Sequence, residues 1–528
     1  MNHEAGYTSS MNRRDFLRLS ALTPVVASLG QHTSVRNPRP NIVVIMADDM
    51  GFSDIGCFGS EIATPNLDRL AKEGLRLTQF YNCARCCPTR ASLLTGLYNH
   101  QAGIAHMVNK RPFPAYQGYL NDRCVTLAEA LRPAGYRVAM SGKWHVGEDR
   151  PHWPTDRGFE RYFGLISGAS NYFRLDKDRK MALNDQPFTP GEGFYMTDAI
   201  TDYAVRYIEE FGSKSEPFLL YVAYTAPHWP LHALPEDIAK YRGKYLKGWD
   251  VLRRERHERQ IAMGIVDRRW LITPRDAGVP AWETVADRDD RDLRMAVYAA
   301  QVDRLDQCIG RLTAKLRQVG VEENTLVLFL ADNGGCAEEK ISGQNPLPPG
   351  PADSFTSYGR PWANASNTPF RLYKHWVHEG GIASPFIARW PRVIKSRNKL
   401  VNHPAHVIDI MATCLDVAGT PYPESSQGKE IAPLEGKSLV PLLREGKRQG
   451  HDALFWEHEG NRAVRQGEFK LVSRHPDRWE IYNMEDDRTE MKDLSKDRPD
   501  LAREMVARYD SWAARCGVLP WDVVRKTK

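Results

Sequence analysis

Two short polar motifs directly follow two apolar runs, and both offer oxygen atoms that could bind a metal ion. Asp48-Asp49 follows the run 41–47, and Asp332-Asn333 follows the run 325–331. Carboxylate and amide oxygens are hard ligands, which favour Ca²⁺ or Mg²⁺ over Zn²⁺. Two adjacent carboxylates at a strand end also repel one another unless a cation lies beside them. The alternative is that Asp48-Asp49 only caps the loop after its strand.

The apolar runs belong to a pattern in which strands alternate with helices. The predicted strands are 41–47, 136–141, 217–224, 325–331 and 384–390, and the predicted helices are 64–74, 125–131, 196–211, 293–319 and 405–419. Continuous apolar runs are typical of strands buried on both faces of a sheet. The alternation predicts an α/β sheet with helices on both sides, and ligands of such sheets bind at the carboxyl ends of the strands.

After about residue 440 the pattern changes to short strands. Segments 454–456, 461–465, 469–472 and 479–482 are predicted to be antiparallel strands, followed by a helix near 499–515. These features predict a large domain over 36–440 and a small C-terminal α+β subdomain over 441–528. Residues 341–369 are predicted to form a long loop at a functional rim. The charge-dense stretches 250–259 and 287–294 are predicted to be solvated helix faces.

The N-terminus, residues 1–35, is predicted to be an export signal and linker. Arg13-Arg14 precedes Phe16-Leu17 and a short apolar run that ends in small residues near Ala27, which resembles a twin-arginine (Tat) signal. The run is too short to span a bilayer comfortably and no cysteine follows it, so no stable membrane anchor is expected. The resemblance implies the Tat machinery as a partner and a bacterial periplasmic or secreted location. The alternative is a basic, frayed terminus.

Composition excludes several classes of protein. Of 528 residues, 42% are hydrophobic and 26% are charged, which fits neither a disordered chain nor a membrane bundle. Nine cysteines in this length exclude a small disulfide-stapled domain. A net charge of +6 is compatible with an anionic substrate and gives no reason to expect nucleic acid as a partner.

The segment Cys86-Cys87-Pro88-Thr89-Arg90, followed by Leu94-Thr95-Gly96, resembles the sulfatase signature C-x-P-x-R. The other motifs of that family occur in order, namely Asp48-Asp49, Gly142-Lys143-Trp144-His145, Pro227-His228, Asp332-Asn333-Gly334, and Lys374 followed by Glu379-Gly380-Gly381. From residue 41 to near the C-terminus the chain resembles the type I sulfatases of the alkaline phosphatase superfamily. This resemblance implies an arylsulfatase-like sulfuric-ester hydrolase with a large mixed, mostly parallel sheet between helices.

The resemblance also implies that a dedicated maturase oxidises Cys86 to Cα-formylglycine (3-oxoalanine). The hydrated aldehyde carries two hydroxyls on one carbon. One attacks sulfur and gives a sulfated hemiacetal, and the other, once deprotonated, restores the aldehyde and expels sulfate. This covalent route splits one difficult step into two easier ones, whereas a plain Ser or Cys would be trapped as its ester.

Roles for five further side chains follow from the same resemblance. Arg90 lies one helical turn after position 86 and would hold the hydrated aldehyde. Lys143 and Lys374 would bind sulfate oxygens. His145 would take the proton from the second hydroxyl, and His228, with Lys374, would assist the leaving oxygen.

A single calcium ion, with magnesium as the alternative, is implied as the cofactor. Its ligands would be the side chains at five positions, Asp48, Asp49, Asp332, Asn333 and the modified Cys86. The ion would polarise the nucleophilic hydroxyl and neutralise sulfate charge.

Three other functions stay open on the sequence. They are a phosphodiesterase or phosphonate monoester hydrolase of the same superfamily, an unmodified carbohydrate- or metal-binding relative, and a thiol–disulfide oxidoreductase that uses Cys83 and Cys86. The substrate is also open between sulfated glycans, phenols and steroids, with 171–173 and 341–369 as pocket candidates. Cys87 could compete with Cys86 for oxidation. No role is assigned to the remaining motif-associated histidines, His100, His106, His232, His375 and His378.

Overall fold

A computed structural model describes residues 39–341 and 347–527 of the chain, so the predicted signal over 1–35 lies outside the described residues. The large sheet contains β1 (Asn41–Ala47), β2 (Leu75–Tyr81), β3 (Arg137–Gly142), β4 (Arg161–Leu165), β5 (Met181–Leu183), β6 (Gln186–Pro187), β7 (Phe218–Ala223), β8 (Thr325–Ala331), β9 (Ala383–Arg389), β10 (Lys399–Val401) and β11 (Ala405–His406). Their order is β10-β2-β9-β8-β1-β7-β3-β4-β5-β6, with β11 beside β2. β1 is parallel to β7 and β8, whereas β9 is antiparallel to β2 and β8. The predicted mixed, mostly parallel sheet is confirmed.

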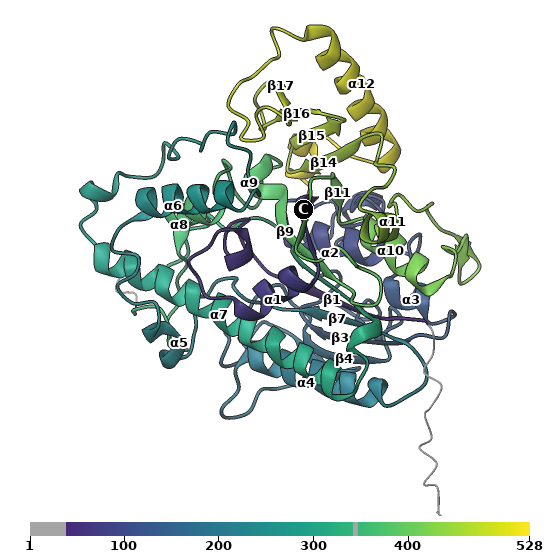
Figure 1. Ribbon diagram of the computed structural model, residues 1–528. Coiled ribbons are helices and arrows are strands. Elements are labelled where there is room, and N and C mark those ends of the chain that lie inside the picture. The colour runs from purple at the N-terminus through teal and green to yellow at the C-terminus, as the bar shows by residue number, and fades with distance from the viewer. Residues whose placement is uncertain (1–38, 342–346, 528) are drawn as a thin grey trace, which may run out of the picture. The chain divides into compact units, whose positions relative to one another are not determined.

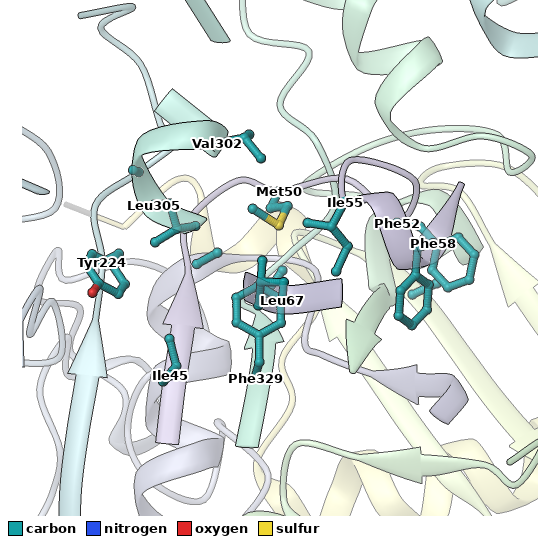
Figure 2. Close-up of a cluster of buried hydrophobic side chains, with 14 of the residues drawn as sticks. Ile45, Met50, Phe52, Ile55, Phe58, Leu67, Tyr224, Val302, Leu305 and Phe329 are labelled. Atoms are coloured by element: carbon teal, nitrogen blue, oxygen red, sulfur yellow. The ribbon is translucent and has the colours of Figure 1, made fainter. Parts of the chain in front are cut away.

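Strand β1 supplies side chains to two separate cores, one on each face of the sheet. Val43, Ile45 and Ala47 belong to one core, and Ile42, Val44 and Met46 belong to the other. Figure 2 shows Ile45 in one cluster with Phe329 of β8 and Leu305 of the long helix α7. Because successive side chains of a strand point to opposite faces, a wholly apolar strand requires cover on both sides.

Helices supply that cover. One face is covered by α1 (Pro65–Glu73), α4 (Met196–Gly212) and α7 (Arg288–Gln318), and the other by α2 (Cys86–Thr95), α3 (Leu127–Leu131), α10 (Asp409–Ala418) and α11 (Val440–Glu445) (Figure 1). The other helices of the large domain are α5 (Pro235–Ala239), α6 (Trp249–Ala262), α8 (Gly359–Ser366) and α9 (Glu379–Ile382). Local sequence sets the helix starts: α1 begins at a proline, which suits a first turn, and α3 begins with a Thr126/Glu129 capping box.

Three predictions about this domain need correction. The predicted loop 341–369 contains helix α8, and its residues 342–346 lie outside the described part. The helix predicted from 405 begins at Asp409, because residues 405–406 pair with β2 as β11. The charged face of α6 is not wholly solvated, since Arg256 is fully buried. Its guanidinium lies 2.7 Å from Asp54 and 2.9 Å from Glu61, and such paired carboxylates allow a buried charge.

The charge-dense start of α7 is also less exposed than predicted. Asp292 is fully buried and Arg294 nearly so. Arg294 donates to Thr356 Oγ1 at 2.7 Å and to the carbonyl oxygen of Ser357 at 3.0 Å. The mixed charges of this helix start predicted a solvent-exposed face. The prediction was wrong because some of these charged side chains have buried polar partners from distant parts of the chain.

The C-terminal part forms its own antiparallel sheet, as predicted. Its strands are β14 (Leu454–His458), β15 (Asn461–Gln466), β16 (Phe469–Ser473) and β17 (Glu480–Asn483), hydrogen-bonded in that order. Helix α12 (Pro499–Cys516) packs on β15 and β16, and α13 (Trp521–Val524) follows it (Figure 1). A small hairpin of β12 (Ser425–Ser426) and β13 (Lys429–Glu430) precedes this sheet. Among the described residues, no helix has both the length and the apolar character to cross a membrane.

A fully buried ion-pair network joins the two sheets. Glu379, at the start of α9, lies 2.9 Å from Lys470 Nζ of β16 and 2.8 Å from Arg488 Nε. Lys470 also lies 2.8 Å from Glu490, and all four side chains are wholly excluded from solvent. Burial alone would raise the pKa of Glu379, but Lys470 and Arg488 lower it to about 2. The network therefore depends on an ionised Glu379.

Glu379→Gln is expected to destabilise the protein by roughly 3–5 kcal/mol at pH 7, because it leaves the buried Arg488 without a carboxylate partner and Lys470 with only Glu490. The folded-state pKa of Glu379, about 2, lies below its ordinary value of 4.5, so its contribution is complete above pH 4.5 and is lost as the pH falls toward 2. Denaturant unfolding of wild type and variant between pH 7 and pH 3 measures the difference. The exposed Glu430→Gln is the control. A difference between wild type and Glu379→Gln that does not shrink below pH 4.5 would contradict the assignment.

Candidate active site

The two acidic motifs predicted at strand ends meet in the structure. Strands β1 and β8 pair in register, with Ala47 opposite Ala331, so the residues that follow them are neighbours. The backbone N–H of Asp49 donates to Asp332 Oδ1 at 3.2 Å, and Asn333 Nδ2 donates to Asp49 Oδ1 at 2.7 Å. The pairing of two strands distant in sequence thus assembles one cluster of oxygen ligands.

This cluster has the chemistry of a cation site. Asp48 Oδ1 and Asn333 Oδ1 are buried and have no hydrogen-bond partner among the described residues. Burial and the neighbouring Asp48 carboxylate raise the pKa of Asp332 to about 8. A bound cation would relieve the repulsion between these two carboxylates. Both unpartnered atoms are oxygens, and oxygen ligands suit Ca²⁺ or Mg²⁺. The side chains that would hold such an ion are Asp48, Asp49, Asp332 and Asn333.

Cys86 is the first residue of α2. Arg85 precedes the helix with an extended backbone, and Gly96 ends it in a left-handed conformation. The ligand atoms of Cys86, Cys87 and His145 lie within 4.8 Å of one another, and all three residues are buried. A hydrogen bond from the Cys87 thiol is the largest cause that lowers the pKa of Cys86 well below its ordinary value, with Lys143 and His145 contributing. Position 86 is therefore a site where negative charge is stabilised.

Lys143 and His145 reach the site from the end of β3. Gly142 permits this approach, because its φ is +123° and a Cβ there would lie 1.9 Å from the carbonyl oxygen of Ala223. Lys143 Nζ lies 2.6 Å from Asp48 Oδ2. His145 lies 3.3 Å from Cys87 Sγ, and burial lowers its pKa to about 4, so its imidazole is neutral at neutral pH.

Lys374 and His228 lie on the other side of the cluster. Lys374 Nζ is 2.8 Å from Asp49 Oδ1 and 3.2 Å from His228 Nε2. His228 Nε2 is also 3.3 Å from Asp49 Oδ2. Burial alone would raise the pKa of Asp49, but His228 and Lys374 lower it to about 2.

Arg90 lies in α2, one helical turn after Cys86, and its polar contacts are with Asp332, Asp48 and the backbone of Lys143. Its guanidinium donates to Asp332 Oδ2 at 2.7 Å and to the carbonyl oxygen of Lys143 at 3.0 Å. Among the described side chains, no hydrogen bond joins Arg90 to Cys86. Arg90 therefore connects the oxygen cluster to the strand end that carries Lys143.

Sequence reasoning missed several neighbours of these residues. Thr89 Oγ1 donates to the carbonyl oxygen of Asp332 at 2.6 Å. Glu338 bridges Arg85 at 2.9 Å and Trp229 Nε1 at 3.2 Å. Arg85 and Trp229 each adjoin a predicted site residue in the chain, which was a usable signal. Nothing local to Glu338 distinguishes it from other acidic loop residues.

Of the two segments predicted to line the substrate pocket, 171–173 contacts a predicted site residue, and part of 341–369 contacts 171–173. Tyr172 donates its hydroxyl to the carbonyl oxygen of His228 at 2.9 Å. Asn171 Nδ2 donates to the carbonyl oxygen of Ala352 at 2.6 Å, so the segment after 347 packs against 171–173.

Comparison with known proteins identifies the family of this chain. The family model described as Sulfatase matches residues 40–420, and the model described as N-sulphoglucosamine sulphohydrolase, C-terminal, matches residues 370–510. An uncharacterised sulfatase of Schizosaccharomyces pombe is 36% identical, over 91% of this chain and 94% of the relative. An arylsulfatase of Klebsiella aerogenes is 33% identical, over 80% of this chain and 96% of the relative.

A solved structure shares the fold. The crystal structure of Ps i-CgsB in complex with k-i-k-neocarrahexaose has a TM-score of 0.68 and 26% identity, over 90% of this chain and 93% of that chain. The family model covers well over half of the sequence, and the relatives align along nearly their whole length. This chain therefore belongs to the sulfatase family, the sulfuric-ester hydrolases of the alkaline phosphatase superfamily.

Proposed function

We propose that this sulfatase hydrolyses sulfate monoesters with a formylglycine hydrate at position 86 as nucleophile and a calcium ion at the oxygen cluster. The observation that carries the proposal is the charge arrangement: three buried cations, Arg90, Lys143 and Lys374, face the carboxylates of two strand ends. Such a site attracts an anionic sulfate ester group, because buried positive groups stabilise charge that develops in a transition state.

The oxygen cluster supports calcium as the cofactor. Asp48, Asp49, Asp332 and Asn333 would hold the ion, which would supply Lewis-acid polarisation of the hydroxyl at position 86 and charge neutralisation. Lys143 and Lys374 would hold the sulfate oxygens from opposite sides of the cluster. Each lysine contacts a different aspartate, Asp48 or Asp49, so the two ammonium groups have separate fixed positions.

The two histidines divide the proton transfers. His145 lies beside the start of α2 and is neutral, so it can take the proton of the second hydroxyl at position 86. His228 lies beside Lys374 on the other side and would serve the leaving oxygen. We propose that Arg90 is a positioning residue, because its contacts are to Asp332 and the backbone of Lys143.

Cys86→Ala is expected to abolish aryl sulfate hydrolysis in protein co-expressed with a maturase, because no aldehyde can form. Cys414→Ala, which removes a buried thiol of α10, is the matched control and should keep activity. The readouts are turnover and the mass of the peptide that spans residue 86, which falls when cysteine becomes formylglycine. Wild-type turnover in Cys86→Ala would contradict the nucleophile. A preference for aryl phosphonate esters over aryl sulfates would contradict the substrate class.

Asp332→Asn is expected to lower the calcium content of purified protein by about tenfold or more, because it removes one charged ligand from an oxygen site. Elemental analysis after dialysis against a defined free calcium concentration measures it. Glu338→Gln changes a carboxyl near the site but outside the proposed ligand set, so this control should retain calcium. Equal calcium content in wild type and Asp332→Asn would refute the ligand assignment.

We also propose that the N-terminal segment directs export by the Tat pathway and that the substrate is a sulfated small molecule or glycan outside the cytoplasm. Replacing Arg13 and Arg14 together by lysine is expected to retain the protein in the cytoplasm of a bacterial host, because the Tat signal requires the arginine pair. Fractionation followed by immunoblotting tests this. Unimpaired export of the double variant would count against a Tat signal.

A further inference from the structure

Three histidines and a glutamate meet where the turn between β14 and β15 contacts the loop after Lys374. His375 directly follows Lys374 in the chain, His458 ends β14, and Glu459 lies in the turn. His106 comes from a distant loop, and its Nε2 lies 2.6 Å from Glu459 Oε1. The proposed sulfatase mechanism uses none of these four residues.

The spacing within this cluster suits a small metal ion. Glu459 Oε2 lies 3.1 Å from His375 Nδ1, and Glu459 Oε1 lies 3.6 Å from His458 Nε2. One ligand atom from each of the three residues lies within 4.8 Å of the other two. Tetrahedral zinc with bonds of about 2.0–2.2 Å places neighbouring ligand atoms about 3.3 Å apart, and the two contacts, which reach different oxygens of Glu459, are each close to that separation.

His458 gives an independent indication of a ligand. Its side chain is fully buried, and neither Nδ1 nor Nε2 has a hydrogen-bond partner among the described residues. The 3.6 Å approach of Nε2 to Glu459 is too long for a hydrogen bond. Buried polar atoms without partners are rare because they lose hydration without compensation. A cation between Nε2 and the carboxylate would satisfy this nitrogen.

The surrounding contacts hold the other ligands. His106 fixes the Glu459 carboxylate, and ligating carboxylates are commonly hydrogen-bonded in this way. Asn461 Nδ2 donates to His375 Nε2 at 3.3 Å, which leaves the His375 proton on Nδ1. Coordination of a cation through Nδ1 therefore requires the proton to move to Nε2, and the 3.3 Å hydrogen bond from Asn461 is then lost.

We propose that His375, His458 and Glu459 bind a divalent transition-metal ion of the zinc class. Two imidazoles and one carboxylate form a three-residue set that leaves a fourth position open. That position is reachable by water, since the side chains of His375 and Glu459 are 28% and 22% exposed. Nitrogen ligands distinguish this site from the all-oxygen cluster, which favours calcium. The ion ties the β14–β15 turn to the loop that carries Lys374.

Cobalt titration of the full-length protein tests this proposal, with saturating Ca²⁺ present to fill the oxygen cluster. One Co²⁺ per chain should bind, give visible d–d absorption and be displaced by Zn²⁺. His375→Ala and Glu459→Gln should each weaken cobalt affinity by about tenfold or more, because each removes a ligand. Circular dichroism checks that each variant is folded, and both residues are partly exposed, unlike His458.

Two controls make the result specific. His257→Ala removes a half-buried histidine of α6, whose Nε2 lies 3.0 Å from the carbonyl oxygen of Trp270, and it should keep wild-type cobalt affinity. Repeating the titration in Cys86→Ala protein removes a thiol of the Cys86, Cys87 and His145 cluster and should leave the cobalt spectrum unchanged. No bound cobalt, unchanged affinity in His375→Ala, or a sulfur-to-cobalt charge-transfer band alone would overturn the proposal. Because the readout is metal binding, the result is independent of sulfatase activity.

Discussion

Electrostatic balance at the ends of β1 and β8 is the constraint on which the site depends. Burying Asp48, Asp49 and Asp332 together is unfavourable unless cations compensate them, because like charges repel strongly away from water. Lys143 and Arg90 approach from one side and Lys374 from the other. Asp48 Oδ1 and Asn333 Oδ1 have no hydrogen-bond partner among the described residues, so these two oxygens are available to one more cation. The proposed anion binding and the proposed metal binding would therefore both follow from one charge arrangement.

The fold delivers these charges from segments that are far apart in the sequence. The β1–β8 pairing aligns the two acidic motifs, the end of β3 supplies Lys143, and the first turns of α2 supply positions 86 and 90. The buried Glu379–Lys470–Arg488 network holds the C-terminal sheet against the segment that follows Lys374. The C-terminal sheet thus helps to set the position of Lys374, a proposed site residue that it does not contain.

The strands, and the polar residues that cluster at their ends, could be predicted because their signals are local. The runs 41–47 and 325–331 are apolar at every position, which is typical of strands covered on both faces, and the structure has both with the same bounds. Motif context identified the buried residues at the strand ends. The buried Arg256, the Glu379 network and the histidine cluster around Glu459 could not be predicted, because each depends on partners tens to hundreds of residues away. Helix α8 was missed because its glycine, proline and asparagine content is typical of loops.

We propose that catalysis requires an aldehyde at position 86 beside the oxygen cluster. Protein can be prepared with graded aldehyde content by varying co-expression of the maturase, and peptide mass spectrometry then gives the modified fraction of each preparation. Turnover of an aryl sulfate should rise in proportion to that fraction and extrapolate to zero when no aldehyde is present. A large turnover that persists at zero aldehyde would contradict the account.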